Sequence, residues 1–259
     1  MEAAGPVRVQ AYLAAMLAVR TEPHAVGPWT AHLHPDGPRP RAEWAVPAGP
    51  EAAEPEAIAA LRAFYAEHGR RAGVEYVDAA VPELRAALRQ AGFELLHDAP
   101  LMVRPAAPPP APVEVPGLAL TAIRPGADPQ DARDFLAVKF EAFGVDQVPP
   151  ADAAGLADAL AWDLGGGEGF LGRIGGAAAG AGQIQATHGG LAEVVAIATA
   201  PPFRRRGVGA AMTAAAAGLA APRGAETVFL SAADEATTRI YARAGFQRAG
   251  SVLGLRDPG

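Results

Sequence analysis

The loop from Arg204 to Gly209 has the residue types and spacing that most clearly indicate chemistry. An apolar stretch and the Pro201-Pro202 turn precede it, and an alanine-rich segment with high helix propensity follows it. Glycine lets the backbone approach a ligand closely, the first turn of a helix offers N–H groups with partial positive charge, and arginine adds full charge. This order predicts a binding site for a phosphate or pyrophosphate group.

The spacing excludes two common nucleotide-binding motifs. The loop reads Arg204-x-x-Gly207-x-Gly209, so it has neither the three glycines of a dinucleotide fingerprint nor the Lys that follows the last glycine of a P-loop. A different phosphate-containing ligand is therefore expected.

Segments on both sides of the loop predict the elements that position it. Their hydrophobic patterns and turn residues indicate a β-α-α-β-β-β-α-β-α-β order. The expected strands cover 118–123, two stretches within 169–187 joined by Gly175-Gly176, 191–199, 227–231 and the segment after Gly245-Phe246. The expected helices cover 128–143, 151–162, 208–220 and 235–244.

This order, the Arg/Gly loop and the run from Tyr241 to Phe246 resemble the GNAT acyltransferase superfamily. The resemblance implies a mixed-sheet α/β fold (α+β) and acetyl-CoA as cosubstrate. It also implies transfer of the acetyl group directly to a primary amine within a ternary complex. No metal ion is expected.

The resemblance further implies which residues bind the coenzyme. Backbone groups of Ile197, Ala198 and Thr199 would pair with pantetheine. The pyrophosphate would be surrounded by Arg204, Arg205, Arg206, Gly207, Val208, Gly209 and Ala210. At least one of the arginines is expected to be only a solvated loop charge. Asp234 stands where relatives often have a coenzyme-contacting Asn; an ionised carboxylate cannot donate a hydrogen bond, so Asp234 is either a contact or a helix N-cap.

Two residues are the candidates for proton transfer. Glu193, 11 residues before Arg204 on an otherwise apolar strand, matches the family's general base. Tyr241 matches the residue that protonates the departing thiolate. The alternatives are a carboxylate that only solvates the strand and a buried tyrosine with a satisfied hydroxyl. A main-chain N–H near Val195 to Ile197, where the family has a bulge, is expected to polarise the carbonyl.

The amino-acid composition excludes several types of site and of partner. The 259 residues are 50% hydrophobic and include no cysteine, which excludes disulfides, thiolate metal sites and cysteine nucleophiles. The net charge of −6 argues against a nucleic-acid partner, and no uninterrupted apolar run of membrane-spanning length is present. We expect a cytoplasmic monomer or homodimer without a membrane partner.

A proline-rich segment divides the chain. Residues 105–116 predict an extended linker between an N-terminal domain, 1–104, and the coenzyme-binding domain, 117–259. Residues 88–94 align with 241–247 around a shared Ala-Gly-Phe, and 43–47 and 55–68 are expected to be a strand and a helix. These features predict a degenerate tandem repeat that binds no coenzyme, because Leu88 replaces Tyr241 and acidic residues replace the Arg/Gly loop: Glu51, Glu54 and Glu56. An unrelated α+β accessory domain is the alternative.

Other candidate residues have weaker support. His32 and His34 lack a third metal ligand at a useful spacing, and a hairpin turn explains them better. His188 is expected in an exposed turn, with a substrate contact as the alternative, and Gly165 to Gly167 in a flexible loop beside the acceptor site.

The acceptor is not defined by the sequence. Several acidic residues favour a cationic small-molecule amine such as a polyamine, an aminoglycoside or an aminoacyl compound, although a solvated helix face explains them equally: Asp146, Asp152, Asp158, Asp163 and Glu168. Protein N-termini or lysines are alternative acceptors. A non-catalytic acyl-CoA-binding sensor and a chain without a coenzyme site are alternatives of other classes.

Overall fold

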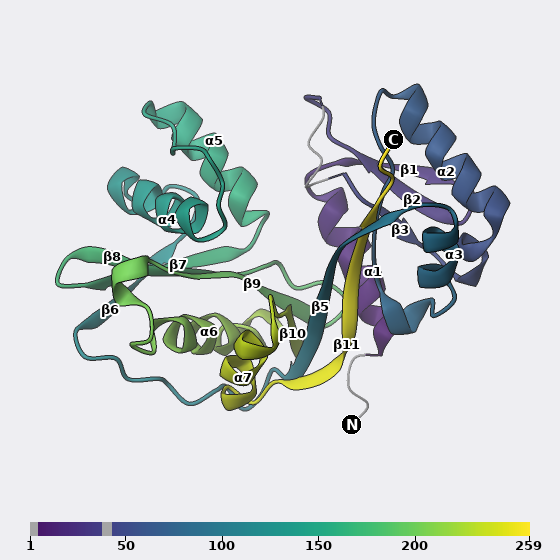
Figure 1. Cartoon of the computed structure of the whole chain (residues 1–259). Helices are drawn as coiled ribbons and strands as arrows, with labels where there is room; N and C mark the ends of the chain where they lie inside the picture. The colour runs from purple at the N-terminus through teal and green to yellow at the C-terminus, as the bar shows by residue number, and fades with distance from the viewer. Residues whose placement is uncertain (1–4, 38–42) are drawn as a thin grey trace. The chain divides into compact units, whose positions relative to one another are not determined.

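The computed structural model describes residues 5–37 and 43–259 of the chain (Figure 1). Contacts divide them into two compact units. Unit 1 contains residues up to 102 together with 231–235 and 248–259, and unit 2 contains 103–230 and 236–247. The domain limits 1–104 and 117–259 stay a prediction from the sequence; contacts group 231–235 and 248–259 with unit 1.

Unit 2 is built on a mixed sheet in the order β10-β9-β8-β7-β6. Its strands are β6 (Leu118–Ile123), β7 (Glu168–Ile174), β8 (Ala177–Ile184), β9 (Leu191–Thr199) and β10 (Thr227–Ser231). Strands β6 to β9 pair antiparallel, and β9 pairs parallel with β10. A parallel pair needs a crossover connection, and the Arg/Gly loop with its helix supplies it.

Helices cover both faces of this sheet (Figure 1). The helices α4 (Pro129–Ala142) and α5 (Ala153–Leu164) lie on one face, and α6 (Val208–Gly218) and α7 (Glu235–Arg243) on the other. Glycines on the strands make room for large side chains. A Cβ on Gly169 would lie 2.6 Å from the Phe135 ring of α4, and one on Gly180 would lie 2.6 Å from Val208 of α6.

The strands of unit 1 follow one another in the sheet in the order β1-β2-β3-β4-β11-β5. Its strands are β1 (Glu22–Val26), β2 (Trp29–Leu33), β3 (Ala45–Pro47), β4 (Gly73–Val77), β5 (Glu94–Pro105) and β11 (Gln247–Arg256). Its helices are α1 (Pro6–Ala18), α2 (Pro55–Glu67) and α3 (Leu84–Gln90). Side chains of α2 and α3 share one core cluster with β2, β4 and β11.

The C-terminal strand β11 is the least local part of this fold. It pairs antiparallel with β4, from Val252 opposite Val77 to Arg256 opposite Gly73. Leu253 and Leu255 are fully buried in the unit 1 core. The last strand of the sequence therefore completes the sheet of the first unit.

The predicted mixed α/β fold is confirmed, and the expected elements agree closely with the observed ones. The strands expected at 118–123, 191–199 and 227–231 have those limits, and α4 to α7 differ from prediction by at most two residues at each end. Over the described residues, no helix is long and apolar enough to cross a membrane.

Candidate functional site

The Arg/Gly loop connects β9 to α6 through a short 3-10 turn, Pro201–Phe203. Gly207 is the N-cap of α6 and has a φ of 85°, a left-handed conformation that favours glycine. Within residues 5–37 and 43–259, no side chain caps α6, whereas Asp128 and Asp152 accept hydrogen bonds from the first turns of α4 and α5. The first N–H groups of α6 therefore remain available for an anion.

The three arginines of the loop are exposed, and they differ in their contacts. The Arg204 Nε donates to the Thr199 carbonyl oxygen at 3.3 Å, and the Arg206 guanidinium lies 5.4 Å from the centroid of the Phe203 ring. Arg205 has a left-handed backbone, with a φ of 62°. All three charges stand close to the start of α6, where its dipole already favours an anion.

Strand β9 contains a bulge directly before the loop. Ala198 lies opposite Ala181 of β8, but Val195 lies opposite Gln183, so β9 has one residue more than β8 across this interval. Ala196 takes the strained conformation, with a φ of 54°. Pairing of β9 with β10 extends only as far as Glu193 opposite Phe229. The bulge expected near Val195 to Ile197 is thus confirmed, and the two strands separate where the coenzyme was predicted to bind.

Glu193 lies at the end of this pairing and is half-buried. Its carbonyl oxygen accepts a hydrogen bond from the Gln185 backbone at 2.8 Å. Side chains alternate along a strand, so Glu193 and Val195 point to one face, the face of the Gln183 side chain. This is the face that α4 and α5 cover.

That face also contains a buried polar cluster that the sequence did not predict. Lys139 of α4, 6% exposed, donates to the Asp163 carboxylate of α5 and, at 2.8 Å, to the Gln183 side-chain oxygen. Gln183 in turn donates to the Asp163 carbonyl oxygen at 2.9 Å. A lone lysine among apolar helix residues and a glutamine in an apolar strand were the available signals.

Tyr241 is buried on α7, and its ring meets Phe246 edge to face at a centroid distance of 6.3 Å. The C-terminus of this helix is held by Arg104, a residue for which the sequence predicted no role. The Arg104 guanidinium donates to the carbonyl oxygens of Ala244 at 2.8 Å, Pro105 at 3.1 Å and Pro108 at 2.5 Å. Burial lowers the pKa of Arg104, and the three carbonyls offset part of the desolvation of its charge.

The remaining predicted site residues lie in different settings. Asp234 is exposed and immediately precedes α7, so the coenzyme-contact and N-cap interpretations both stay predictions. His188 is exposed and bridges to Leu191, as expected for a turn. The 165–167 loop is packed tightly at one point, because a Cβ on Gly167 would lie 2.1 Å from the Ile184 carbonyl oxygen.

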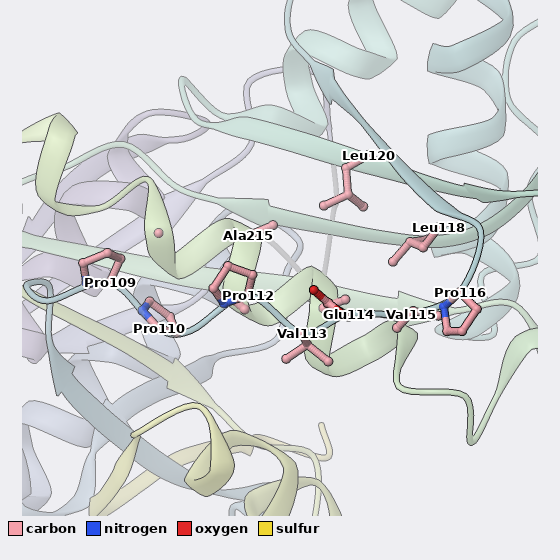
Figure 2. A pocket seen from close by; sticks show the side chains of 13 residues that line it. Pro109, Pro110, Pro112, Val113, Glu114, Val115, Pro116, Leu118, Leu120 and Ala215 are labelled. Atoms are coloured by element: carbon pink, nitrogen blue, oxygen red, sulfur yellow. The ribbon is translucent and has the colours of Figure 1, made fainter.

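The proline-rich segment is in contact with α6 rather than free in solution. A groove of about 790 Å³ lies between it, α6 and β6 (Figure 2), lined mainly by apolar residues with Glu114 among them. A Cβ on Gly207 would lie 3.3 Å from Val115, which packs against Val208 and Met212. This segment therefore forms one wall beside the start of α6.

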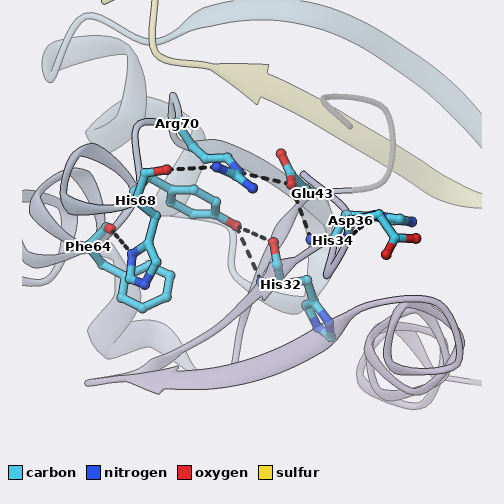
Figure 3. A network of polar contacts seen from close by, with 8 residues as sticks. His32, His34, Asp36, Glu43, Phe64, His68 and Arg70 are labelled. Carbon is cyan, nitrogen blue, oxygen red and sulfur yellow. Dashed lines mark hydrogen bonds and ion pairs between the residues drawn. The ribbon is translucent and has the colours of Figure 1, made fainter. Parts of the chain in front are cut away.

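The His32-x-His34 segment belongs to a polar network inside unit 1 (Figure 3). The Glu43 carboxylate accepts from the His34 backbone and from the Arg70 Nε, each at 3.1 Å, and the Tyr65 hydroxyl donates to the His32 carbonyl oxygen at 3.3 Å. Among the described residues, no group of three acidic or histidine side chains could hold a metal ion. The predicted turn is present at 34–37, and the residues that follow it lie outside the described ranges.

Comparisons with known proteins agree on the type of fold. The profile of the acetyltransferase (GNAT) family matches residues 138–246, which include β7 to β10 and the Arg/Gly loop. A search of curated proteins finds no match.

Solved structures match over nearly the whole chain. A GCN5-related N-acetyltransferase from Kribbella flavida is 25% identical, with a TM-score of 0.80 over 98% of this chain and 96% of that one. One from Sphaerobacter thermophilus is 20% identical, with a TM-score of 0.61 over 91% and 82%. A tandem GNAT protein from the clavulanic acid biosynthesis pathway is 15% identical, with a TM-score of 0.60 over 97% and 94%.

Proposed function

Because the chain belongs to the GNAT acetyltransferase family, we propose that unit 2 transfers the acetyl group of acetyl-CoA to the primary amine of a small molecule. The observation that carries this proposal is the combination of an uncapped, arginine-flanked start of α6 with the separation of β9 and β10 after Glu193. Such an arrangement suits a ligand with a phosphate group at one end and an extended arm.

The residues present fit acetyl-CoA. Gly207 has the left-handed φ that turns the chain into α6, and Gly209 lies in the first turn of α6, over Thr199 and Ile197 of β9. Backbone groups of Val208 to Ala210 and the charges of Arg204 to Arg206 would hold the pyrophosphate, and Ile197 to Thr199 would pair with pantetheine. When bound, the coenzyme supplies an activated acetyl thioester.

The chain supplies proton transfer around that thioester. The Glu193 carboxylate would accept a proton from the acceptor ammonium or amine, directly or through water. The N–H groups of the β9 bulge would stabilise charge that develops on the acetyl oxygen. The Tyr241 hydroxyl would donate its proton to the departing sulfur. Transfer is direct and requires no acylated residue, in agreement with the absence of cysteine.

Release of free thiol from acetyl-CoA across a panel of primary amines tests the proposal. Turnover that falls strongly in Glu193→Gln and Tyr241→Phe, with acetyl-CoA binding unchanged, would support it. Tight coenzyme binding with no thiol released by any amine, peptide N-terminus or lysine peptide would instead favour a non-catalytic acyl-CoA-binding protein.

A further inference from the structure

The end of α7 is held by one buried arginine, Arg104, which lies at the end of β5. All three nitrogens of its guanidinium donate hydrogen bonds. Nη1 donates to the Ala244 carbonyl oxygen at 2.8 Å. Nε donates to the Pro105 oxygen at 3.1 Å, and Nη2 to the Pro108 oxygen at 2.5 Å. Arg104 is 8% exposed, so these carbonyls take the place of water around its charge. The end of α7 is thereby joined to β5 and to the proline-rich segment.

Short contacts connect this arginine to Tyr241. The N–H groups of Ala244 and Phe246 both donate to the Tyr241 carbonyl oxygen, at 2.9 and 3.1 Å. The Phe246 ring contacts both side chains: its centroid lies 5.9 Å from the Arg104 guanidinium carbon and 6.3 Å from the centroid of the Tyr241 ring. Movement of the Arg104 guanidinium would therefore change the position of the Tyr241 backbone and of the ring that packs against Tyr241.

A similar contact occurs in unit 1, at the end of α3. There the Arg62 guanidinium donates to the Ala91 carbonyl oxygen, and its carbon lies 4.8 Å from the centroid of the Phe93 ring. Arg62 also forms an ion pair with Asp257 at 2.9 Å. Arg104, in the part of the chain that the structure describes, forms no ion pair and binds carbonyl oxygens instead. Both turns are thus held by an arginine, and only the one in unit 2 follows a tyrosine.

We propose that Arg104 is a positioning residue for the transfer reaction, which fixes the last turn of α7 so that the Tyr241 hydroxyl meets the departing sulfur. This inference rests on the proposed function of Tyr241 as proton donor. When the C–S bond of the thioester breaks, the sulfur takes the hydroxyl proton, and this transfer requires the two atoms to lie at hydrogen-bond distance. A lysine cannot replace Arg104, because its ammonium donates from one nitrogen, whereas the guanidinium spreads its donors over three nitrogens in a plane.

The test introduces Arg104→Lys into native protein and into Tyr241→Phe. In native protein it should lower kcat by about 10- to 100-fold, with the Kd for acetyl-CoA unchanged. In Tyr241→Phe it should lower kcat by less than about 2-fold, because the hydroxyl that Arg104 positions is already absent. Arg62→Lys is the matched control, since α3 has Leu88 in place of Tyr241, and it should leave kcat unchanged. An equal loss of kcat in both backgrounds would show a merely structural role and overturn the inference.

Hydrogen exchange of the Phe246 amide, which donates to the Tyr241 carbonyl oxygen, measures the hold on α7 without turnover. Arg104→Lys should accelerate this exchange by about 10-fold and Arg62→Lys should not. If Tyr241→Phe loses activity while Arg104→Lys keeps the native kcat or the native exchange rate, the inference alone is wrong. If Tyr241→Phe keeps the native kcat, or if no amine is acetylated, the proposed function of Tyr241 is wrong and the inference fails with it.

Discussion

Units 1 and 2 end their last helices in the same way, although they carry different residues there. In α3, the Phe93 N–H donates to the Leu88 carbonyl oxygen at 2.9 Å, with Gly92 at a φ of 88°. In α7, Phe246 donates to Tyr241 at 3.1 Å, with Gly245 at a φ of 85°. The backbone turn is common to both units, whereas the hydroxyl proposed as proton donor is present in unit 2 alone.

The strand-to-helix connections differ more strongly. In unit 2, the connection from β9 to α6 contains Arg204 to Arg206 and Gly207, whose backbone is left-handed. In unit 1, Gly49 is extended, with a φ of −172°, and Glu51 and Glu54 precede α2. Negative charge at a helix N-terminus stabilises that helix and repels a phosphate. The two helix starts thus carry opposite charge, positive before α6 and negative before α2.

The largest difference between the units is expected in catalysis. Glu193→Gln should lower kcat by about 100- to 10,000-fold because it removes the proposed general base. The rate of thiol release at saturating acetyl-CoA and acceptor gives kcat. Glu67→Gln, at an exposed residue of unit 1, is the control. Equal rates in native protein and Glu193→Gln would contradict the assignment.

A second expected effect is a pH dependence of the stability of unit 1, caused by His32. Burial, with a smaller contribution from nearby His24, lowers the pKa of His32 from its usual 6.5 to about 4. The unfolded chain therefore binds more protons between these values, so the free energy of unfolding should decrease as pH falls from 6.5 to 4, by up to about 3 kcal/mol.

Hydrogen exchange of the β2 amides between pH 4 and 7.5 measures this dependence. A His32→Gln variant should lose most of it, and His188→Gln, at an exposed position, should retain it. An unchanged pH slope in His32→Gln would show that other groups are responsible.

A smaller effect is expected from the charges of the coenzyme loop. Arg205→Glu should raise the Kd for acetyl-CoA by about 10-fold, and increasing salt should reduce the difference because the side chain is exposed. Titration calorimetry at two ionic strengths measures it, with Arg89→Glu of unit 1 as control. A Kd insensitive to Arg205→Glu would mark this residue as the solvated loop charge.

The smallest effect is expected from adding positive charge to unit 1. The double variant Glu51→Arg, Glu54→Arg should still bind a single acetyl-CoA per chain, because Gly49 does not turn the backbone as Gly207 does. Calorimetric stoichiometry measures this. A second bound coenzyme would show that charge alone separates the two units.

Local signals allowed much of unit 2 to be predicted. Gly175-Gly176 fixed the β7–β8 turn, Asp128-Pro129 the start of α4, and the Ala-Gly-Phe motif the end of α7. Pairing of β11 with β4 could not be predicted, since it depends on residues more than 170 positions apart, such as Val252 and Val77.

Contacts at the site that the sequence did not predict also join residues that are far apart in the chain. Contacts of Lys139 with Gln183 and of Arg104 with Ala244 arise only when distant elements pack together. Residue spacing along the chain does not predict such packing. The Arg/Gly loop, in contrast, is contiguous in the sequence and could therefore be recognised there.

Thermal unfolding with and without acetyl-CoA tests the central claim most directly, in native protein, Gly207→Glu and Gly175→Glu. Both glycines have a left-handed φ, and a Cβ on Gly175 would meet open space, so Gly175→Glu reports the cost of the backbone strain and added charge alone. At about 100 times its Kd, the ligand should stabilise native protein and Gly175→Glu by about 2.7 kcal/mol, and Gly207→Glu not at all. Equal stabilisation of all three proteins, or of none, would contradict a coenzyme site at the start of α6.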